Sequence, residues 1–254
     1  MQAAVKTIGI GIGTDAERVI GSACRASVPC DIICYSRPGT AKVPAGHKNV
    51  RILKSEAPET TLISDLMTGA IDAAVRGTLP AKATLQALKI AAGVDHLERI
   101  ALLETASGKK FLFAPVGIDE GWTVADKLAL IWKGRLVAKR FGLPGKVGVL
   151  SGGRLGDVGR HARVDRSMAD AELVARLGDA VHCEILIEDA VESCGLIIAP
   201  DGISGNLVFR TLTLLGAGYA HGAPVVNIDK IFVDTSRASP DYANALLLAA
   251  SLLE

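Results

Sequence analysis

The stretch Ile71-Asp72-Ala73-Ala74-Val75-Arg76-Gly77-Thr78 shows the pattern that decides the fold. A short apolar run, typical of a buried strand, ends at an arginine and a glycine, and a segment of helical period follows at 82–91. A glycine lets a ligand approach the backbone, and a guanidinium offers a fixed fork of donors to phosphate or carboxylate. Arg76 and Gly77 are therefore candidate substrate-binding residues, with a surface arginine at a turn as the alternative.

The same alternation of short apolar runs and helical segments continues along the whole chain. Continuous apolar strands separated by helices predict an α/β fold with a mainly parallel sheet covered on both faces. Strands are predicted at Val5–Ile12, Asp31–Tyr35, Val50–Leu53, Ile71–Val75, Arg99–Leu103, Phe111–Val116, Val147–Leu150, Leu196–Pro200 and Val225–Val233. Helices are predicted at Ala16–Ala26, Thr60–Thr68, Lys82–Ala91, Val124–Phe141, Ala169–Leu177, Asn206–Tyr219 and Tyr242–Leu253.

The composition favours small-molecule chemistry over binding to nucleic acid or to a membrane. The 254 residues are 49% hydrophobic and carry a formal net charge of +1, which gives no global field for recruiting polyanions. Only 4% of the residues are aromatic, and none alternate with a basic patch. No apolar run approaches the roughly 18 residues that a membrane span needs. We expect no nucleic acid and no membrane among the partners.

The cysteines and the N-terminus indicate a cytoplasmic protein. The five cysteines include no CxxC pair, which favours buried reduced thiols and a reducing compartment. The first residues, MQAAVKTIGIGIG, lack the order of charges and apolar residues of a signal peptide.

In open α/β sheets, ligands bind beyond the carboxyl ends of the strands. The strand end richest in polar residues is Ser151-Gly152-Gly153-Arg154-Leu155-Gly156-Asp157-Val158-Gly159-Arg160. Successive backbone N–H groups in such a loop can form an anion-binding nest, although no Gly-Lys-Ser/Thr follows as in a P-loop. Ser151, Gly152, Gly153 and Arg154 are candidate substrate-binding residues, and Asp157 and Arg160 are second-rank candidates. The alternative is a flexible surface loop.

Two further strand ends are also candidates. Pro200-Asp201-Gly202-Ile203-Ser204-Gly205-Asn206 precedes a predicted helix, whose N-terminus favours an anion. Gly205 and Asn206 are candidate ligands here. Asp201 is a candidate to orient a donor or take a proton, or it merely closes the turn, and Ser204 is equally consistent with a simple N-cap.

Val233-Asp234-Thr235-Ser236-Arg237 ends the last predicted strand. The hydroxyl of Ser236 beside Arg237 is suited to hold a phosphoryl oxygen or a developing oxyanion. We predict catalytic roles for Ser236, Arg237 and Asp234. A final helix is expected to start at Ser239-Pro240-Asp241, with Ser239 as the N-cap.

Three other patterns carry less weight. Asp119 and Glu120 follow a strand between glycines and are second-rank candidates for a general base, or part of an exposed turn. The glycines of Gly9–Gly13 miss the GxGxxG spacing of a dinucleotide site. His182-Cys183-Glu184 are adjacent in sequence and so alternate between faces in a strand, which argues against a metal site. No metal is predicted.

Several of these segments resemble known families. Four stretches, in the same order, are similar to phosphate acetyl- and butyryltransferases and to acyl-phosphate synthases of phospholipid biosynthesis: Thr68-Gly69-Ala70 onward, Val147–Ser151, Pro200–Asn206 and Asp234–Arg237. The MtxX family, also called methanogenesis marker protein 4, is a closer resemblance. Its blocks resemble AVRGTL at Ala74–Leu79, APVGIDEG at Ala114–Gly121, LSGGRLGDVGR at Leu150–Arg160, APDGISGNLVFRTL at Ala199–Leu212 and VDTSR at Val233–Arg237.

The resemblance implies a fold like that of isocitrate and isopropylmalate dehydrogenases, with two α/β lobes and a cleft between them. It places residues 1–116 with 226–254 in the first lobe and 117–225 in the second. It also implies a methanogenic archaeal source, a homo-oligomer such as a dimer, and coenzyme A as a possible ligand.

Two positions depart from the acyltransferase pattern. In those enzymes an aspartate downstream of the Ser-Arg pair acts as base toward the coenzyme A thiol, whereas here the ungapped position is Ala243, with Asp241 two residues earlier. Ala238 stands where a glycine usually follows the arginine. The cofactor is therefore left unknown, while the anion site is retained.

Three functions follow from these observations. The first is a group-transfer enzyme, phosphate acyltransferase-like, acting on a small phosphorylated or anionic substrate. The second is a methyltransferase or methyltransferase subunit linked to methanogenesis, although no adenosylmethionine loop or corrinoid signature is recognisable. The third is a non-catalytic metabolite-binding or assembly subunit, which the departure at Ala243 favours.

Overall fold

The computed structural model describes residues 5–40 and 42–253, and the chain divides into two compact units. The first unit comprises residues 1–97 and 221–254, and the second comprises residues 98–220. The sequence analysis placed these boundaries at 116/117 and 225/226. They lie earlier because the strand pair of residues 101–114 pairs with the sheet of the second unit.

The sheet of the first unit has the strand order β3-β2-β1-β4-β11-β10. Its strands are β1 (Lys6–Gly11), β2 (Cys30–Ser36), β3 (Val50–Lys54), β4 (Ala73–Val75), β10 (Tyr219–Pro224) and β11 (Ile231–Asp234). The first five in this order are parallel, and β10 is antiparallel to β11. The carboxyl ends of β1, β4 and β11 therefore lie at one edge of the sheet.

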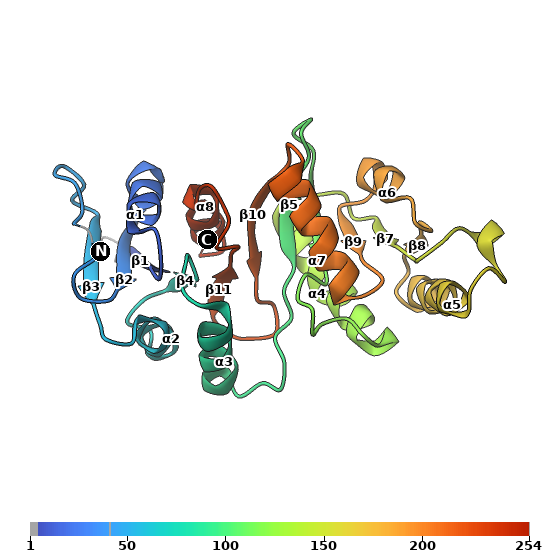
Figure 1. Cartoon of the computed structure of the whole chain (residues 1–254), viewed down its shortest axis with the longest axis horizontal. Helices are drawn as coiled ribbons and strands as arrows, with labels where there is room; N and C mark the ends of the chain where they lie inside the picture. Colours follow the sequence, from blue (N-terminus) through green and yellow to red (C-terminus); the bar gives the residue numbers. More distant parts are fainter. Residues whose placement is uncertain (1–4, 41, 254) are drawn as a thin grey trace. The chain divides into compact units, whose positions relative to one another are not determined.

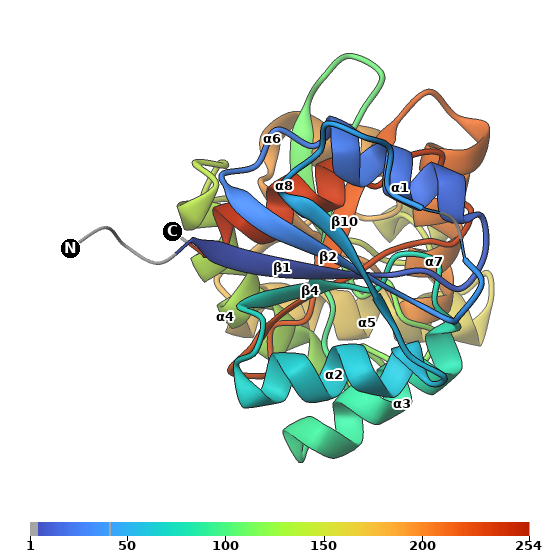
Figure 2. The ribbon, with the colours of Figure 1, turned by 90° about the vertical axis from the view of Figure 1, so that its left-hand side faces the viewer.

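Four helices cover this sheet, two on each face. Figure 2 shows α1 (Ala16–Arg25) and α8 (Ala243–Ser251) on one face, and α2 (Pro58–Thr68) and α3 (Ala81–Ala92) on the other. The sequence predicted α8 with Ser239 as its N-cap, which is wrong. The helix begins at Ala243, whose N–H donates to the Asp241 carboxylate, while Ser239 Oγ donates to the Asp241 carbonyl.

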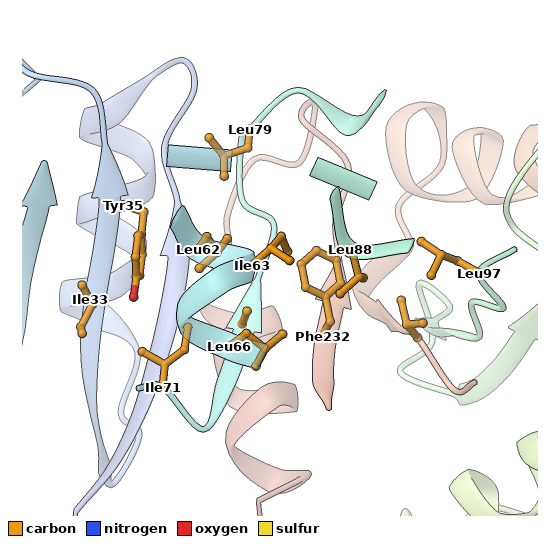
Figure 3. Close-up of a cluster of buried hydrophobic side chains, with 12 residues drawn as sticks. Ile33, Tyr35, Leu62, Ile63, Leu66, Ile71, Leu79, Leu88, Leu97 and Phe232 are labelled. Atoms are coloured by element: carbon orange, nitrogen blue, oxygen red, sulfur yellow. The ribbon is translucent and has the colours of Figure 1, made fainter. Parts of the chain in front are cut away.

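A buried apolar cluster fills the space between the sheet and the helices α2 and α3 (Figure 3). Tyr35 from β2, Leu62 and Leu66 from α2, and Phe232 from β11 are fully buried in it. The Tyr35 hydroxyl donates to the Asp65 carboxylate at 2.7 Å, which satisfies its polar end. Burial, followed by the hydrogen bond to Asp65, raises the pKa of Tyr35 above its usual value. The core thus fixes β1, β2, β4 and β11 relative to each other.

The sheet of the second unit has the order β5-β6-β9-β7-β8. Its strands are β5 (Ala101–Glu104), β6 (Lys110–Ala114), β7 (Val147–Val149), β8 (Val181–His182) and β9 (Leu196–Ile198). β5 and β6 are an antiparallel hairpin, while β6, β9, β7 and β8 are parallel. The carboxyl ends of these four strands therefore share an edge.

The helices of the second unit are α4 (Val124–Arg140), α5 (Ala162–Leu177), α6 (Ile187–Ser193) and α7 (Gly202–Arg210). Figure 1 shows α6 on the opposite side of the sheet from α4 and α5. A capping box formed by Thr123 and Asp126 starts α4, and the turn at Phe141–Gly142 ends it, close to the bounds Val124–Phe141 that the sequence predicts.

Two sequence predictions for residues 206–233 are wrong. The predicted helix Asn206–Tyr219 starts earlier, at Gly202, and ends at Arg210 in a π-helical turn over Thr211–Leu215. The predicted strand Val225–Val233 is instead the end of a hairpin, with β10 before it and β11 at Ile231–Asp234. Polar residues at Asn227, Asp229 and Lys230 interrupt the apolar run and make the connection between the two strands.

Candidate functional site

The turns after β1 and β4 are joined to each other in the first unit. The Thr78 hydroxyl accepts from the N–H groups of Gly13 at 3.0 Å and Thr14 at 3.2 Å, and donates to the Thr14 carbonyl at 2.7 Å. Gly77 has a φ of +61°, and a Cβ at this position would lie 2.1 Å from the carbonyl oxygen of Gly11. Gly77 thus serves the close packing of the two turns, rather than the approach of a ligand that the sequence suggested.

Arg76 is buried and bonded to the protein itself. Its Nε donates to the Asp234 carboxylate, its Nη1 donates to the Leu79 carbonyl at 2.8 Å, and its Nη2 donates to the Thr235 carbonyl. The residue is only 5% exposed. Nε and Nη2 therefore hold the end of β11 against the end of β4, and Nη1 holds the turn that follows β4. The structure gives Arg76 and Asp234 a structural role as an ion pair.

Ser236 and Arg237 keep their polar groups available at the same edge. The Ser236 hydroxyl oxygen accepts from the Ala238 N–H at 3.2 Å, so its proton is free to donate. Arg237 is exposed, and among residues 5–40 and 42–253 its guanidinium has no hydrogen-bond or ion-pair partner. Its carbonyl is held by Arg18 Nη2 at 3.1 Å and by the Tyr242 hydroxyl at 3.3 Å.

Arg18 and Tyr242 complete this group of side chains. The Arg18 guanidinium carbon lies 5.8 Å from the centre of the Tyr242 ring, and Arg18 Nε lies 3.2 Å from the Asp15 carboxylate. Burial raises the pKa of Tyr242, and Arg18 and Arg76 oppose that shift. We call Arg18, Ser236, Arg237 and Tyr242 the arginine cluster. Its arginines and the Ser236 hydroxyl suit a small anion such as phosphate, while the buried Tyr242 hydroxyl donates to the carbonyls of Ser236 and Arg237.

The sequence analysis did not find Arg18 or Tyr242. Arg18 lies in the first turn of the helix after β1, which a parallel sheet places at the same edge as the end of β11. A basic residue in the first turn of a helix that follows a parallel strand can therefore be recognised from the sequence as a candidate for the site at that edge.

In the second unit, Asp201 caps α7. Its carboxylate accepts from the Ser204 N–H at 2.8 Å and from the Ser204 hydroxyl at 2.9 Å. Asp201, and not Ser204, is therefore the N-cap, and Ser204 completes the capping box. The Asp201 carboxylate is thus already used in capping the helix, which argues against the catalytic role that the sequence predicted for it.

Gly205 and Asn206 join α7 to the segment after β6. A Cβ on Gly205 would lie 1.9 Å from the Pro115 carbonyl oxygen, and Asn206 Nδ2 donates to the Val116 carbonyl at 2.9 Å. The amide group of Asn206 is thus partly used in packing. Gly205 is therefore required by the close packing against Pro115, and the Asn206 amide by its hydrogen bond to Val116.

Glu120 is a buried carboxylate and Asp119 is an exposed one. Arg99 Nε donates to Glu120 Oε1 at 2.6 Å, and the Gly117 N–H donates to Oε2 at 3.2 Å. Burial raises the pKa of Glu120, while the Arg99 guanidinium lowers it. The turn that carries both residues is therefore held together by Glu120, which makes it a poor general base.

Lys127 is a buried lysine that the sequence analysis missed. It lies in the first turns of α4 and is 5% exposed. Burial lowers its pKa, and the carboxylates of Asp170 and Asp201 oppose that shift. The sequence of the segment Val124–Arg140 alone does not indicate that its basic residue Lys127 is buried.

The loop after β7 satisfies most of its backbone donors internally. The N–H groups of Gly152, Arg154, Leu155 and Gly159 donate to Ser167, Asp157, Glu184 and Asp165. The predicted anion nest is thus largely filled by side chains of the protein itself. Arg160 pairs with Asp157 at 2.6 Å. Arg154 is exposed, and no described residue pairs with its side chain.

Ser151 is buried at the start of this loop. Its Oγ lies 2.9 Å from the Gly153 carbonyl and 2.9 Å from His182 Nε2.

The described residues form neither a membrane-spanning helix nor a metal-binding cluster. Within residues 5–40 and 42–253, no helix is long and apolar enough to cross a membrane. Over the same residues, no group of three or more His, Cys, Asp or Glu side chains is placed to hold a metal ion.

Comparison with known proteins identifies the family. The chain is 49% identical over 208 residues to a protein of Methanosarcina barkeri named "Putative methyltransferase mtx subunit X", a match that covers 80% of this chain and 77% of that one. The chain belongs to the mtx subunit X family. A second member, described as an uncharacterized methyltransferase of Methanopyrus kandleri, is 38% identical over 96% of this chain and 98% of its own length. No protein-family model matches the chain.

Solved structures show what fold the mtx subunit X family has. A branched-chain phosphotransacylase from Enterococcus faecalis is similar with a TM-score of 0.72 at 18% identity, over 98% of this chain and 99% of that one. A phosphotransacetylase from Streptococcus pyogenes gives a TM-score of 0.70 at 16% identity, over 98% and 94% of the two chains. The resemblance to MtxX and the phosphotransacetylase-like α/β fold are confirmed.

Proposed function

We propose that this chain is a group-transfer protein that binds a small phosphorylated substrate through the arginine cluster of its first unit. The observation that carries the proposal is that Arg237 is exposed and has no partner among the described residues, whereas Arg76 is paired with Asp234. Arg18 is opposed by Asp15. One positive charge of the cluster is therefore left for a ligand at the carboxyl edge of a parallel sheet, where α/β proteins bind ligands.

The reaction that the geometry supports best is acyl transfer from an acyl phosphate. The guanidinium group of Arg237 neutralises the phosphoryl oxygens, and the Ser236 hydroxyl donates to the carbonyl oxygen as negative charge develops on it. The acceptor attacks the carbonyl carbon, the bond from that carbon to the phosphate oxygen breaks, and inorganic phosphate leaves with the electron pair and takes the proton that the acceptor loses. The fold of the phosphotransacylase from Enterococcus faecalis supports this choice.

The residues near Arg237 do not supply a base for the thiol of coenzyme A. Asp241, the nearest downstream carboxylate in sequence, pairs with Arg25 at 2.5 Å and accepts from the Ala243 N–H at 2.5 Å. We therefore assign no step to coenzyme A, and the acyl acceptor is a variable in the test.

The first experiment measures phosphate binding by calorimetry with the whole chain. Arg237→Gln should weaken inorganic phosphate binding about ten- to a hundredfold, the effect of losing a charged hydrogen bond worth about 1.5–3 kcal/mol. Arg51→Gln is the matched control, because Arg51 is exposed in the same unit but lies near the amino end of β3. Equal binding by the wild type and both variants would remove the anion site.

The second experiment measures release of phosphate from acyl phosphates of different chain length, with coenzyme A, other thiols or water as acceptor. Turnover that falls in Ser236→Ala supports acyl transfer. Phosphate binding without turnover for any donor and acceptor would instead favour a non-catalytic subunit, which the engaged Asp241 makes a specific alternative.

The names of the relatives favour a second function, that of a methyltransferase subunit. Calorimetry with adenosylmethionine and with a corrinoid protein tests it directly. Binding of either ligand that is independent of Arg237 would support this function, and silence in both titrations would remove it. The prediction that residues of both units face one cleft stays a prediction, which a loss of phosphate binding in Arg154→Gln would support.

A further inference from the structure

Three side chains of the second unit lie in one hydrogen-bonded chain. His182 Nε2 lies 2.9 Å from Ser151 Oγ, and His182 Nδ1 lies 3.1 Å from Glu172 Oε2. Ser151 follows the end of β7, His182 ends the neighbouring parallel strand β8, and Glu172 lies on α5, which packs on both strands. Each residue is thus delivered by a rigid element.

The chemistry of these groups limits the direction of the hydrogen bonds. An ionised carboxylate only accepts, so in the bond to Glu172 the Nδ1 of His182 carries the proton. The Gly153 carbonyl also only accepts, so the single proton of the Ser151 hydroxyl is donated either to that carbonyl or, where His182 Nε2 carries no proton, to Nε2. The second state is the arrangement of a nucleophilic serine with its base and its orienting acid, which is recognised by geometry and role rather than by fold.

The exposed fractions of the three side chains fit this role. The Ser151 residue is 2% exposed, and the side chains of His182 and Glu172 are 7% and 67% exposed. The hydroxyl and the imidazole are thus shielded from water, while the carboxylate stays charged in solvent. The Ser151 hydroxyl has one proton and two neighbouring groups that can accept it, His182 Nε2 and the Gly153 carbonyl, so the reactive state is the one in which the proton points to His182.

The residues after Ser151 are small and leave one donor unused. Gly152 and Gly153 carry no side chains, and Gly152 is exposed while Gly153 is buried. A Cβ on Gly153 would lie 2.6 Å from Val164 Cγ1, so this glycine packs closely against α5. The N–H of Gly153 has no hydrogen-bond partner among residues 5–40 and 42–253, while the neighbouring N–H groups of Ser151, Gly152 and Arg154 are all bonded. We take this N–H as the candidate donor to an oxyanion formed at Ser151.

We propose that Ser151 is a nucleophilic serine, activated by His182 and positioned with Glu172, that takes the acyl group of a small activated carboxylic ester. Ser151 Oγ attacks the carbonyl carbon while its proton passes to His182 Nε2. The bond to the leaving alcohol breaks, and the alcohol oxygen takes that proton. Water then attacks the acyl-serine, gives a proton to His182 and releases the carboxylic acid as the Ser151 hydroxyl is restored. This site does not depend on the arginine cluster.

The test uses a small alkyl fluorophosphonate and a nitrophenyl acetate on the whole chain. We expect one phosphonyl adduct per chain, located on Ser151 by peptide mass spectrometry, and a burst of one nitrophenolate per chain. Ser151→Ala should lose both signals, and His182→Gln should slow them about a hundredfold or more, the usual contribution of a general base. Glu172→Gln should slow them less, because its carboxylate is solvent-exposed.

Ser107→Ala is the matched control, since Ser107 is an exposed serine of the same unit whose hydroxyl meets only Thr105. It should label at the wild-type rate. Cooperative thermal unfolding of each variant shows that it is folded, and if Ser151→Ala does not fold, the His182→Gln rate decides. Folded wild-type protein that forms no adduct, or an adduct on another serine, overturns the proposal and leaves the three residues as a structural network that holds the edge strand β8.

Discussion

The turn after β4 and the loop after β7 contain the same residue types, arginine and glycine beside a hydroxyl residue, but they use them differently. In the turn after β4, the arginine side chain is buried. Arg76 is 5% exposed and is bonded to Asp234 and to two carbonyl groups. In the loop after β7, the arginine side chain is exposed. No described residue forms a hydrogen bond or an ion pair with the side chain of Arg154.

The backbone N–H groups are used in both regions, but by different acceptors, since those of Arg76 and Thr78 donate to the carbonyls of Val233 and Gly11. The N–H groups after β7 are mostly bonded to side chains, among them Asp157 and Glu184, so the loop is internally braced while its arginine is free. A glycine- and arginine-rich strand end therefore does not identify an anion site by composition. What decides is which donors the protein itself has already used.

The largest expected effect comes from Arg76. Arg76→Met would leave the Asp234 carboxylate, which is 8% exposed, without this cation in a buried position. Breaking a buried pair by removing one partner costs about 3–5 kcal/mol. Denaturant titration of the variant should show a free energy of unfolding lower by that amount.

The control for Arg76→Met is the same substitution at Arg154, in the loop after β7. Arg154→Met removes an exposed side chain and should change the free energy of unfolding by less than about 0.5 kcal/mol. Similar losses in both variants would show that the two arginines do not differ in the way the structure indicates.

Much of the fold could be predicted from the sequence, because apolar runs and helical periods are local signals. The strands at residues 6–11, 30–36 and 50–54 and the helices at 16–25, 58–68 and 81–92 lie within about two residues of the predicted bounds. The hairpin of β10 and β11 was missed, since the short, mostly polar segment Tyr219–Pro224 is recruited as a strand by pairing with β11. Such pairing is a tertiary effect that a local pattern does not carry.

The candidate site was predicted less well than the fold. The sequence selected Ser236 and Arg237, which the structure places in the arginine cluster, but it treated Arg76 and Arg237 as equivalent. The partner of Arg76 is Asp234, 158 residues away, so the pairing could not be read from the local sequence. The chain Ser151–His182–Glu172 was missed for the same reason, because β7, β8 and α5 bring its members together.

A second, intermediate effect compares a glycine from each region. Gly77→Ala would place a Cβ 2.1 Å from the Gly11 carbonyl oxygen at a φ of +61°. The left-handed conformation costs about 1–2 kcal/mol and the overlap about 1–3 kcal/mol, so the variant should lose about 2–5 kcal/mol of stability.

Gly152→Ala is its counterpart. The new Cβ would meet Ser167 at 3.4 Å, an ordinary contact, so the loss should stay below about 1 kcal/mol. Calorimetric melting of both variants measures the difference. A Gly152→Ala variant that melts as early as Gly77→Ala would mean that the loop after β7 is packed as tightly as the turn after β4.

The smallest effect concerns the brace of the loop after β7. The Asp157 carboxylate accepts from the Arg154 N–H at 2.9 Å and from Arg160 Nη1 at 2.6 Å, and these bonds hold its pKa below the usual range. A carboxylate with a lowered pKa in the folded state adds stability above its unfolded pKa and loses it as the pH falls through the folded value. Asp157→Asn should therefore melt slightly earlier than wild type at neutral pH, and the gap should close as the solution is acidified below the usual range of an aspartate. A gap that stays constant down to strong acid would show that the carboxylate acts by its shape and not by its charge, and the loop would then owe its form to Glu184 and Asp165, which accept from other N–H groups.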